Sequence, residues 1–167
     1  MASSAGGGGS VEAFLKISGK KQGPLNSESD VPGHVGEIRV LAWSLGASLS
    51  IDAVTKLQSG RRSWTDLTFT KHVDRTTPLL YLALVNNDEI KAELLVRTIA
   101  ETPIDTLKIS IDKGRVHSMS SGSGGGTSMS ETVTLSFAKI TIDYMMQGQG
   151  RSRGANVTCQ DDFSEIT

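Results

Sequence analysis

A short segment near the C-terminus, Gly150–Gly154 (G-R-S-R-G), matches the G-x-S-x-G turn that exposes a nucleophilic serine in many hydrolases. A serine of this kind, here Ser152, needs a helix after it and a histidine base further along the chain. No helical pattern follows Ser152, and the histidines at 34, 72 and 117 all precede it. We therefore interpret the match as a coincidence.

The three histidines also lack the spacing of metal ligands, because none has a second histidine or cysteine two to four residues away. Asp66 and Asp74 flank His72, and carboxylates beside an imidazole are the groups used in acid–base catalysis. A surface turn with solvated charges explains the same pattern. We therefore expect no catalytic residue, no metal and no cofactor, and the chain is not expected to be an enzyme.

The composition excludes several other classes of protein. The chain has 167 residues, of which 21% are charged and 5% aromatic, with a formal net charge of −1. A nucleic-acid partner would require clustered Lys and Arg, and membrane insertion would require an apolar run of roughly 18 residues. Neither is present. The single Cys159 fits synthesis in a reducing cytoplasm, and the Gly/Ser-rich start is unlike a cleaved signal peptide.

The elements that would position these residues are mostly strands. Alternation of apolar and polar residues predicts strands over the ranges 11–18, 35–47, 63–71, 90–98, 106–112, 116–119 and 131–144. One helix is predicted, with Thr77 as N-cap, Pro78 at its first position, and Leu79, Leu82 and Ala83 facing inward. Asn86 and Asn87 supply its stop.

Several strands carry irregularities. Phe14 stands on the polar face of the first strand, so we expect it to be exposed or to contact another subunit. Lys113 and Gly114 predict a bend, and the apolar residues of 131–144 change face midway, as in a strand that passes from one sheet to another. In 35–47, Leu41 and Trp43 belong to a bulky core-facing set, together with Leu45.

These patterns predict a mainly β protein, a barrel-like two-sheet fold with one short α-helix and a long extended loop. We expect a flexible Gly/Ser-rich tail at 1–10, one β-barrel domain at 11–146, and a polar tail with little order at 147–167. The long loop runs from Lys20 to His34, where Leu25 and Val31 are apolar anchors.

Four blocks of sequence in order resemble the haemolysin-coregulated protein (Hcp) family, the tube subunits of type VI secretion systems. The blocks are A-F-L-K-I-S-G at 13–19, G-E-I-R-V-L-A-W-S-L-G at 36–46, D-L-T-F-T-K-H-V-D-R-T-T-P at 66–78, and the Gly/Ser tip with the following strand at 120–140. Three departures occur: the family usually has W-S-W at 43–45 and Y-x-P-Q at 144–147, and the Gly-rich N-terminal extension is unusual for it.

The resemblance implies a homo-hexameric ring that stacks into a tube inside a contractile sheath, with a spike protein at the tip. The tube carries effectors and is expelled with them, so the protein is expected to be cytoplasmic when assembled and secreted without a cleaved signal peptide. The loop residues Leu25, Asn26, Val31 and His34 are then predicted to contact the next ring, and the small residues Ala42 and Ser44 to face the lumen. The alternatives are a tail-tube subunit of a phage-like contractile particle, a β-barrel ligand-binding protein or a hydrolase.

Overall fold

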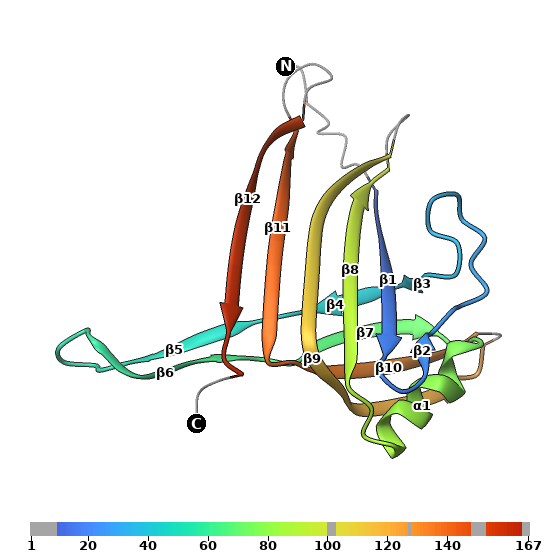
Figure 1. Cartoon of the computed structure of the whole chain (residues 1–167), viewed down its shortest axis with the longest axis horizontal. Helices are drawn as coiled ribbons and strands as arrows, with labels where there is room; N and C mark the ends of the chain where they lie inside the picture. Colours follow the sequence, from blue (N-terminus) through green and yellow to red (C-terminus); the bar gives the residue numbers. More distant parts are fainter. Residues whose placement is uncertain (1–9, 100–102, 127, 148–152, 165–167) are drawn as a thin grey trace.

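The computed structural model describes residues 10–99, 103–126, 128–147 and 153–164 (Figure 1). One helix and a series of strands make up this part of the chain. In order they are β1 (Val11–Gly19), β2 (Gly23–Pro24), β3 (Ile38–Val40), β4 (Ala42–Ser44), β5 (Ala47–Ile51), β6 (Gln58–Trp64), β7 (Leu67–His72), α1 (Thr76–Val85), β8 (Ile90–Thr98), β9 (Ile104–Ser123), β10 (Met129–Ser136), β11 (Lys139–Gln147) and β12 (Arg153–Asp162).

Two antiparallel sheets share the long strand β9. The first half of β9 lies between β8 and β11 in a sheet that also contains β1, β2, β3 and β12, and its second half pairs with β10 in a sheet that continues to β7 and β4. The predicted bend occurs between the halves, where Lys113 has a φ of 51°. A side chain at Gly114 would lie 2.8 Å from the Ser136 carbonyl oxygen, so the bend requires glycine there.

A second crossing joins the sheets at Phe137 and Ala138, which separate β10 from β11. Val133 and Leu135 face the core in β10, and Ile140 does so in β11. The predicted change of face within 131–144 is therefore confirmed, and its cause is passage from one sheet to the other. The predicted fold class is confirmed as well, although the described strands form an open rather than a closed barrel.

Apolar side chains from both sheets and the helix fill the space between the layers. Each fully buried Leu, Ile or Phe contributes about 1.5–3 kcal/mol relative to exposure. The largest of the fully buried apolar side chains are Phe14, Leu15, Ile17, Ile38, Leu67, Phe69, Leu80, Ile90, Leu94, Ile109 and Ile111.

The expectation that Phe14 is exposed or contacts another subunit is wrong, because Phe14 is buried within its own subunit. Its ring stacks on the imidazole of His34 with 4.2 Å between the ring centres, and the Arg97 guanidinium lies 5.0 Å from its centre. The long polar loop thus covers the outer face of β1 at this point. Alternation within one strand cannot reveal such a cover, because the covering residue comes from another segment.

The helix begins at Thr76, two residues before the predicted first position Pro78, and Thr77 is not its N-cap. The side chain of Asp74 accepts the Thr76 N–H at 2.8 Å, while the hydroxyl of Thr77 donates to Glu131 at 2.7 Å. Inward-facing residues also differ, since Leu80 and Ala83 are buried with Thr76, whereas Leu82 is exposed and Leu79 is half-buried. The predicted stop is confirmed, because Asn87 has a φ of 48°.

The predicted strand 35–47 is divided among β3, β4 and the start of β5. β3 pairs with β1 and β4 with β7, so the chain changes sheets at Leu41. This change reverses the expected faces there, leaving Val40 buried and Leu41 exposed, while Trp43 is half-buried against the core. Ala42 lies on an exposed face, as does Ser44.

Two further differences concern segments that were not predicted to be strands. Residues 153–162 form β12, which pairs along β11, although little order was expected after 146. The connection before 63 is a hairpin of β5 and β6 that projects away from the two sheets (Figure 1). Of the expected N-terminal tail, 1–9 lies outside the described residues.

Candidate functional surfaces

The residues with catalytic potential are scattered over the structure. Asp66 pairs with His117, 2.9 Å away on the surface, whereas Asp74 belongs to a separate buried network. The side chain of His72 is exposed. Residues 150–152, including Ser152 of the G-x-S-x-G match, lie outside the described residues. In the described part of the chain, no three His, Cys, Asp or Glu side chains gather closely enough to hold a metal.

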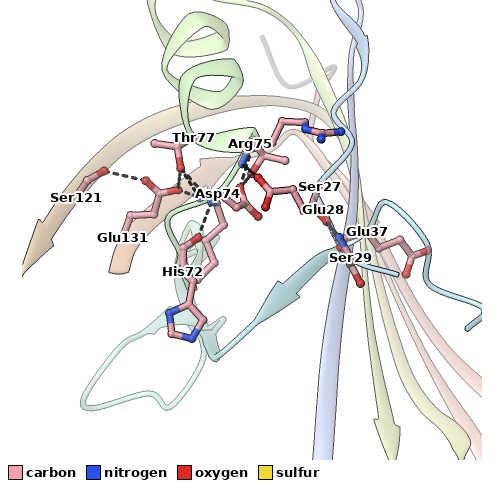
Figure 2. Close-up of polar contacts among 12 residues, drawn as sticks. Ser27, Glu28, Ser29, Glu37, His72, Asp74, Arg75, Thr77, Ser121 and Glu131 are labelled. Carbon is pink, nitrogen blue, oxygen red and sulfur yellow. Dashed lines mark hydrogen bonds and ion pairs between the residues drawn. The ribbon is translucent and has the colours of Figure 1, made fainter. Parts of the chain in front are cut away.

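A buried ion network lies where α1 meets β7 and β10 (Figure 2). The fully buried ammonium of Lys71 forms an ion pair with the carboxylate of Glu131, which is buried as well. Lys71 also donates to Asp74 Oδ1 and to the His72 carbonyl oxygen, each at 3.0 Å. The network brings together groups from two strands and from the turn that precedes the helix.

Hydroxyl groups complete the network. Glu131 accepts from Thr77 at 2.7 Å and from Ser121 at 2.8 Å, and Ser121 lies near the end of β9 (Figure 2). Partial burial raises the pKa of Asp74, but the hydrogen bonds from Thr76 and Lys71 and the charge of Lys71 outweigh it and leave that pKa below its ordinary value. Each charge has a partner, so the network attaches α1 to the sheet and offers no free acid or base.

The outer face of the second sheet carries small hydroxyl side chains. Residues directly opposite one another across antiparallel strands share a face. Ser44, Thr68, Thr134 and Ser118 thus form one row, and Ala42, Thr70, Thr132 and Ser120 form the next. None of these residues is charged. We call these two rows the hydroxyl face, and both residues predicted to face the lumen, Ala42 and Ser44, lie on it.

The residues predicted to contact the next ring separate into two groups. Leu25 and His34 are buried within the subunit, at 3% and 8% exposure, and His34 Nδ1 bonds to Glu37 Oε2 at 2.5 Å. Asn26 is exposed and Val31 is half-buried. Two of the four predicted contact residues thus pack on their own subunit. Of the four, only Asn26 and Val31 remain available for contact with another copy.

The β5–β6 hairpin is the segment that projects furthest from the sheets (Figure 1). Its strands form a separate two-stranded sheet. Four aliphatic side chains on it are exposed: Leu49, Ile51, Val54 and Leu57. An exposed apolar group of this size on a projecting segment is typical of a contact with another protein.

A second apolar surface continues the core towards the free edge of the first sheet. Leu107, Tyr144 and Val157 lie opposite one another on β9, β11 and β12, on the core-facing side. Leu107 is half-buried, but Tyr144 and Val157 are 48% and 58% exposed. The upper parts of β11 and β12 rise beyond the strands of the second sheet, which leaves this face uncovered (Figure 1). We call Leu107, Tyr144 and Val157 the apolar strip.

Residues 14–144 match the family model described as "Type VI secretion system effector, Hcp". This chain belongs to the Hcp family. Protein hcp1 of Pseudomonas aeruginosa is 36% identical over 142 residues, covering 82% of this chain and 85% of the relative. The Hcp family consists of structural, secreted tube proteins of type VI secretion and is not a family of enzymes. The expectation that this chain is not an enzyme is therefore confirmed.

Solved Hcp structures agree with this fold. Hcp1 from Salmonella typhimurium has a TM-score of 0.72 and 28% identity, covering 92% of this chain and 94% of that one. Hcp1 from an E. coli EAEC 042 pathovar has a TM-score of 0.78 at 22% identity, covering 92% and 99%, and supports the fold alone. The described part of this Hcp chain contains no helix long and apolar enough to cross a membrane.

The buried network was not predicted from the sequence, although a signal for it was present. Lys71 shares the parity of Leu67 and Phe69 in β7, and Glu131 shares that of Val133 in β10. Since Leu67, Phe69 and Val133 face the core, the same alternation places both charged residues inside. The ion pair follows from their register, because Lys71 and Glu131 lie directly opposite each other.

Proposed function

We propose that six copies of this chain close into a ring, and that the rings stack into the inner tube of a type VI secretion system. Membership of the Hcp family supports this assignment. In the finished machine the tube lies inside a contractile sheath, has a spike protein at its tip and carries effectors through its lumen. The subunits assemble in the cytoplasm and leave the cell with the tube.

The observation that supports the proposed ring is the apolar strip, which lies beside a free strand edge. β12 pairs only with β11 among the described strands, so its other edge presents unpaired backbone groups. Tyr144 and Val157 expose apolar surface on the core-facing side of the same edge. A neighbouring copy that packs on this strip buries both features. This contact joins the strip of one copy to a different surface of the next copy. When it is repeated around a closed circle, it produces a ring.

Stacking of rings is assigned to the projecting segments. The β5–β6 hairpin extends its aliphatic side chains beyond the body of the subunit, where an adjacent ring can bury them. Asn26 and Val31 on the surface of the long loop are the remaining candidates for the same contact. Two kinds of interface, one closing and one open-ended, are what a tube built of rings requires.

The hydroxyl face is proposed as the lumen wall. Its side chains are small and uncharged, so it attracts neither acidic nor basic cargo strongly and exposes little apolar surface to which cargo could adhere. Weak hydrogen bonding to many hydroxyls suits a wall that must hold different effectors and release them. Ala42 and Ser44 belong to this wall.

The test of the ring is a charge placed on the apolar strip. Val157→Lys is expected to reduce the mass in light scattering from about six subunits to one, because a buried interface cannot accommodate an unpaired ammonium. Gln160→Lys is the matched control, since Gln160 lies on the same strand but faces the opposite side. The unmodified chain and the control are expected to remain rings. A monomeric unmodified chain at tens of micromolar, or intact rings of Val157→Lys, would contradict the proposal.

A further inference from the structure

The end of β12 holds the base of the β5–β6 hairpin through three hydrogen bonds to one carboxylate. Arg62 Nε donates to Asp161 Oδ2 and Arg62 Nη2 to Asp161 Oδ1, both at 2.6 Å. Trp64 Nε1 donates to Asp161 Oδ2 at 2.8 Å. Arg62 and Trp64 belong to β6, so residues almost a hundred positions apart meet here. We call Arg62, Trp64 and Asp161 the hairpin clamp.

Aromatic packing lies next to the clamp. The rings of Trp64 and Phe137 pack in a T-shaped arrangement with 6.3 Å between their centres, and the rings of Phe137 and Phe163 are tilted with 6.0 Å between theirs. The Phe163 N–H donates to the Ala138 carbonyl oxygen at 2.9 Å, which fixes the segment after β12 at the corner between β10 and β11. Trp64 thus packs against the ring of Phe137, and its indole nitrogen is bound by the carboxylate of Asp161.

Other contacts at the base of the hairpin are few. Gly46 and Thr65 exchange backbone and hydroxyl hydrogen bonds between 2.7 and 3.2 Å, but these join the two hairpin ends to each other. The residues from Ala47 to Ser59 are all exposed. An isolated two-stranded hairpin is marginally stable in water, so its direction relative to the subunit depends on contacts made at its base.

We propose that Asp161 is a positioning residue that sets the direction of the β5–β6 hairpin, so that stacking of one ring on the next depends on the C-terminal strand. The inference rests on the proposed function, in which this hairpin contacts the adjacent ring. A bidentate arginine–carboxylate pair with a third donor defines an orientation more strictly than a single contact does. Because exposed ion pairs add little to global stability, the effect of the clamp is on orientation.

The test compares Asp161→Ala with Asp162→Ala. Asp162 is the next residue of β12, and its carboxylate bonds within its own turn to Ser164. Asp161→Ala is expected to speed amide hydrogen exchange across 47–64 about tenfold, with exchange in β7 and β10 unchanged. Its rings are expected to keep their mass but to form no tubes in electron micrographs. The double variant Arg62→Asp, Asp161→Arg restores the ion pair and is expected to regain part of the protection.

Three results would contradict parts of this proposal. Unchanged exchange in 47–64 of Asp161→Ala would overturn it, as would equally fast exchange throughout the chain, which indicates general destabilisation. Normal tubes from a variant with a loosened hairpin would overturn the link to stacking. If the unmodified chain forms rings but no tubes, the tube assignment fails, while hydrogen exchange in the soluble ring still decides whether Asp161 positions the hairpin.

Discussion

Replacing Lys71 by methionine removes the cation from the buried network but keeps a long, unbranched side chain in its place. The ammonium of Lys71 pairs with two carboxylates and donates to a carbonyl oxygen and to Thr77 Oγ1 in a fully buried position. Its loss leaves Glu131 buried without a counter-charge. Breaking a buried ion pair in this way costs about 3–5 kcal/mol.

The structure places Lys71→Met at the lower end of that range. Glu131 keeps the hydroxyl donors Thr77 and Ser121, and Asp74 is partly exposed, so both carboxylates retain some stabilisation. We expect a loss of about 3 kcal/mol in the free energy of unfolding, which corresponds to roughly 6–12 °C in Tm for a chain of this size. Urea unfolding followed by tryptophan fluorescence measures it. Protein concentration must be equal in all samples, because assembly adds stability by mass action.

Two further variants separate the buried charge from a general effect of substitution. Adding Glu131→Leu to Lys71→Met removes the uncompensated carboxylate, so the double variant is expected to be more stable than Lys71→Met alone. Lys91→Met breaks only the exposed pair with Asp112, at 3.4 Å, and is expected to cost less than about 1 kcal/mol. A loss below about 1 kcal/mol for Lys71→Met would refute the reasoning, since it would mean that Glu131 tolerates burial without the cation.

Two predictions concern the lumen and the clamp. Ser44→Gln should keep the ring mass but weaken capture of effectors, with Ser48→Gln on the hairpin as control; an unfolded Ser44→Gln would show that this residue faces the core. The hydrogen bond from Arg62, and then that from Trp64, lowers the pKa of Asp161 from 3.8 to about 2. Because the folded-state pKa is the lower one, the clamp's stabilisation is complete above about pH 4 and is lost as the pH falls towards 2. Protection of 47–64 in hydrogen exchange, corrected for intrinsic rates, should fall in that window, and Asp161→Ala should show no such step.

Much of this architecture could be predicted from local sequence. The strands of the two sheets follow from alternation, and the bend at Lys113–Gly114 from a glycine flanked by two apolar patterns. The crossing between sheets follows from the change of face in 131–144, and the end of the helix from Asn86–Asn87. Each of these signals is carried by residues a few positions apart, because strand and helix geometry repeats over a few residues.

Faces covered by distant segments could not be predicted in this way. Phe14 is buried because His34 stacks on it, and Leu41 is exposed because the chain changes sheets there. The order of residues 153–162 depends on pairing with β11, since the segment has no apolar pattern strong enough to indicate a strand by itself.

The sequence by itself determined the mainly β fold, the single helix and, through four ordered blocks, the resemblance to the Hcp family. Only the tertiary structure decided which segment projects. The long loop around Leu25 folds back on its own subunit, and the hairpin at 47–64 extends instead, with Arg62 held by Asp161. The physical reason is that burial and orientation depend on partners far away in the chain, whereas the local pattern records only which side chains are apolar and how they are spaced.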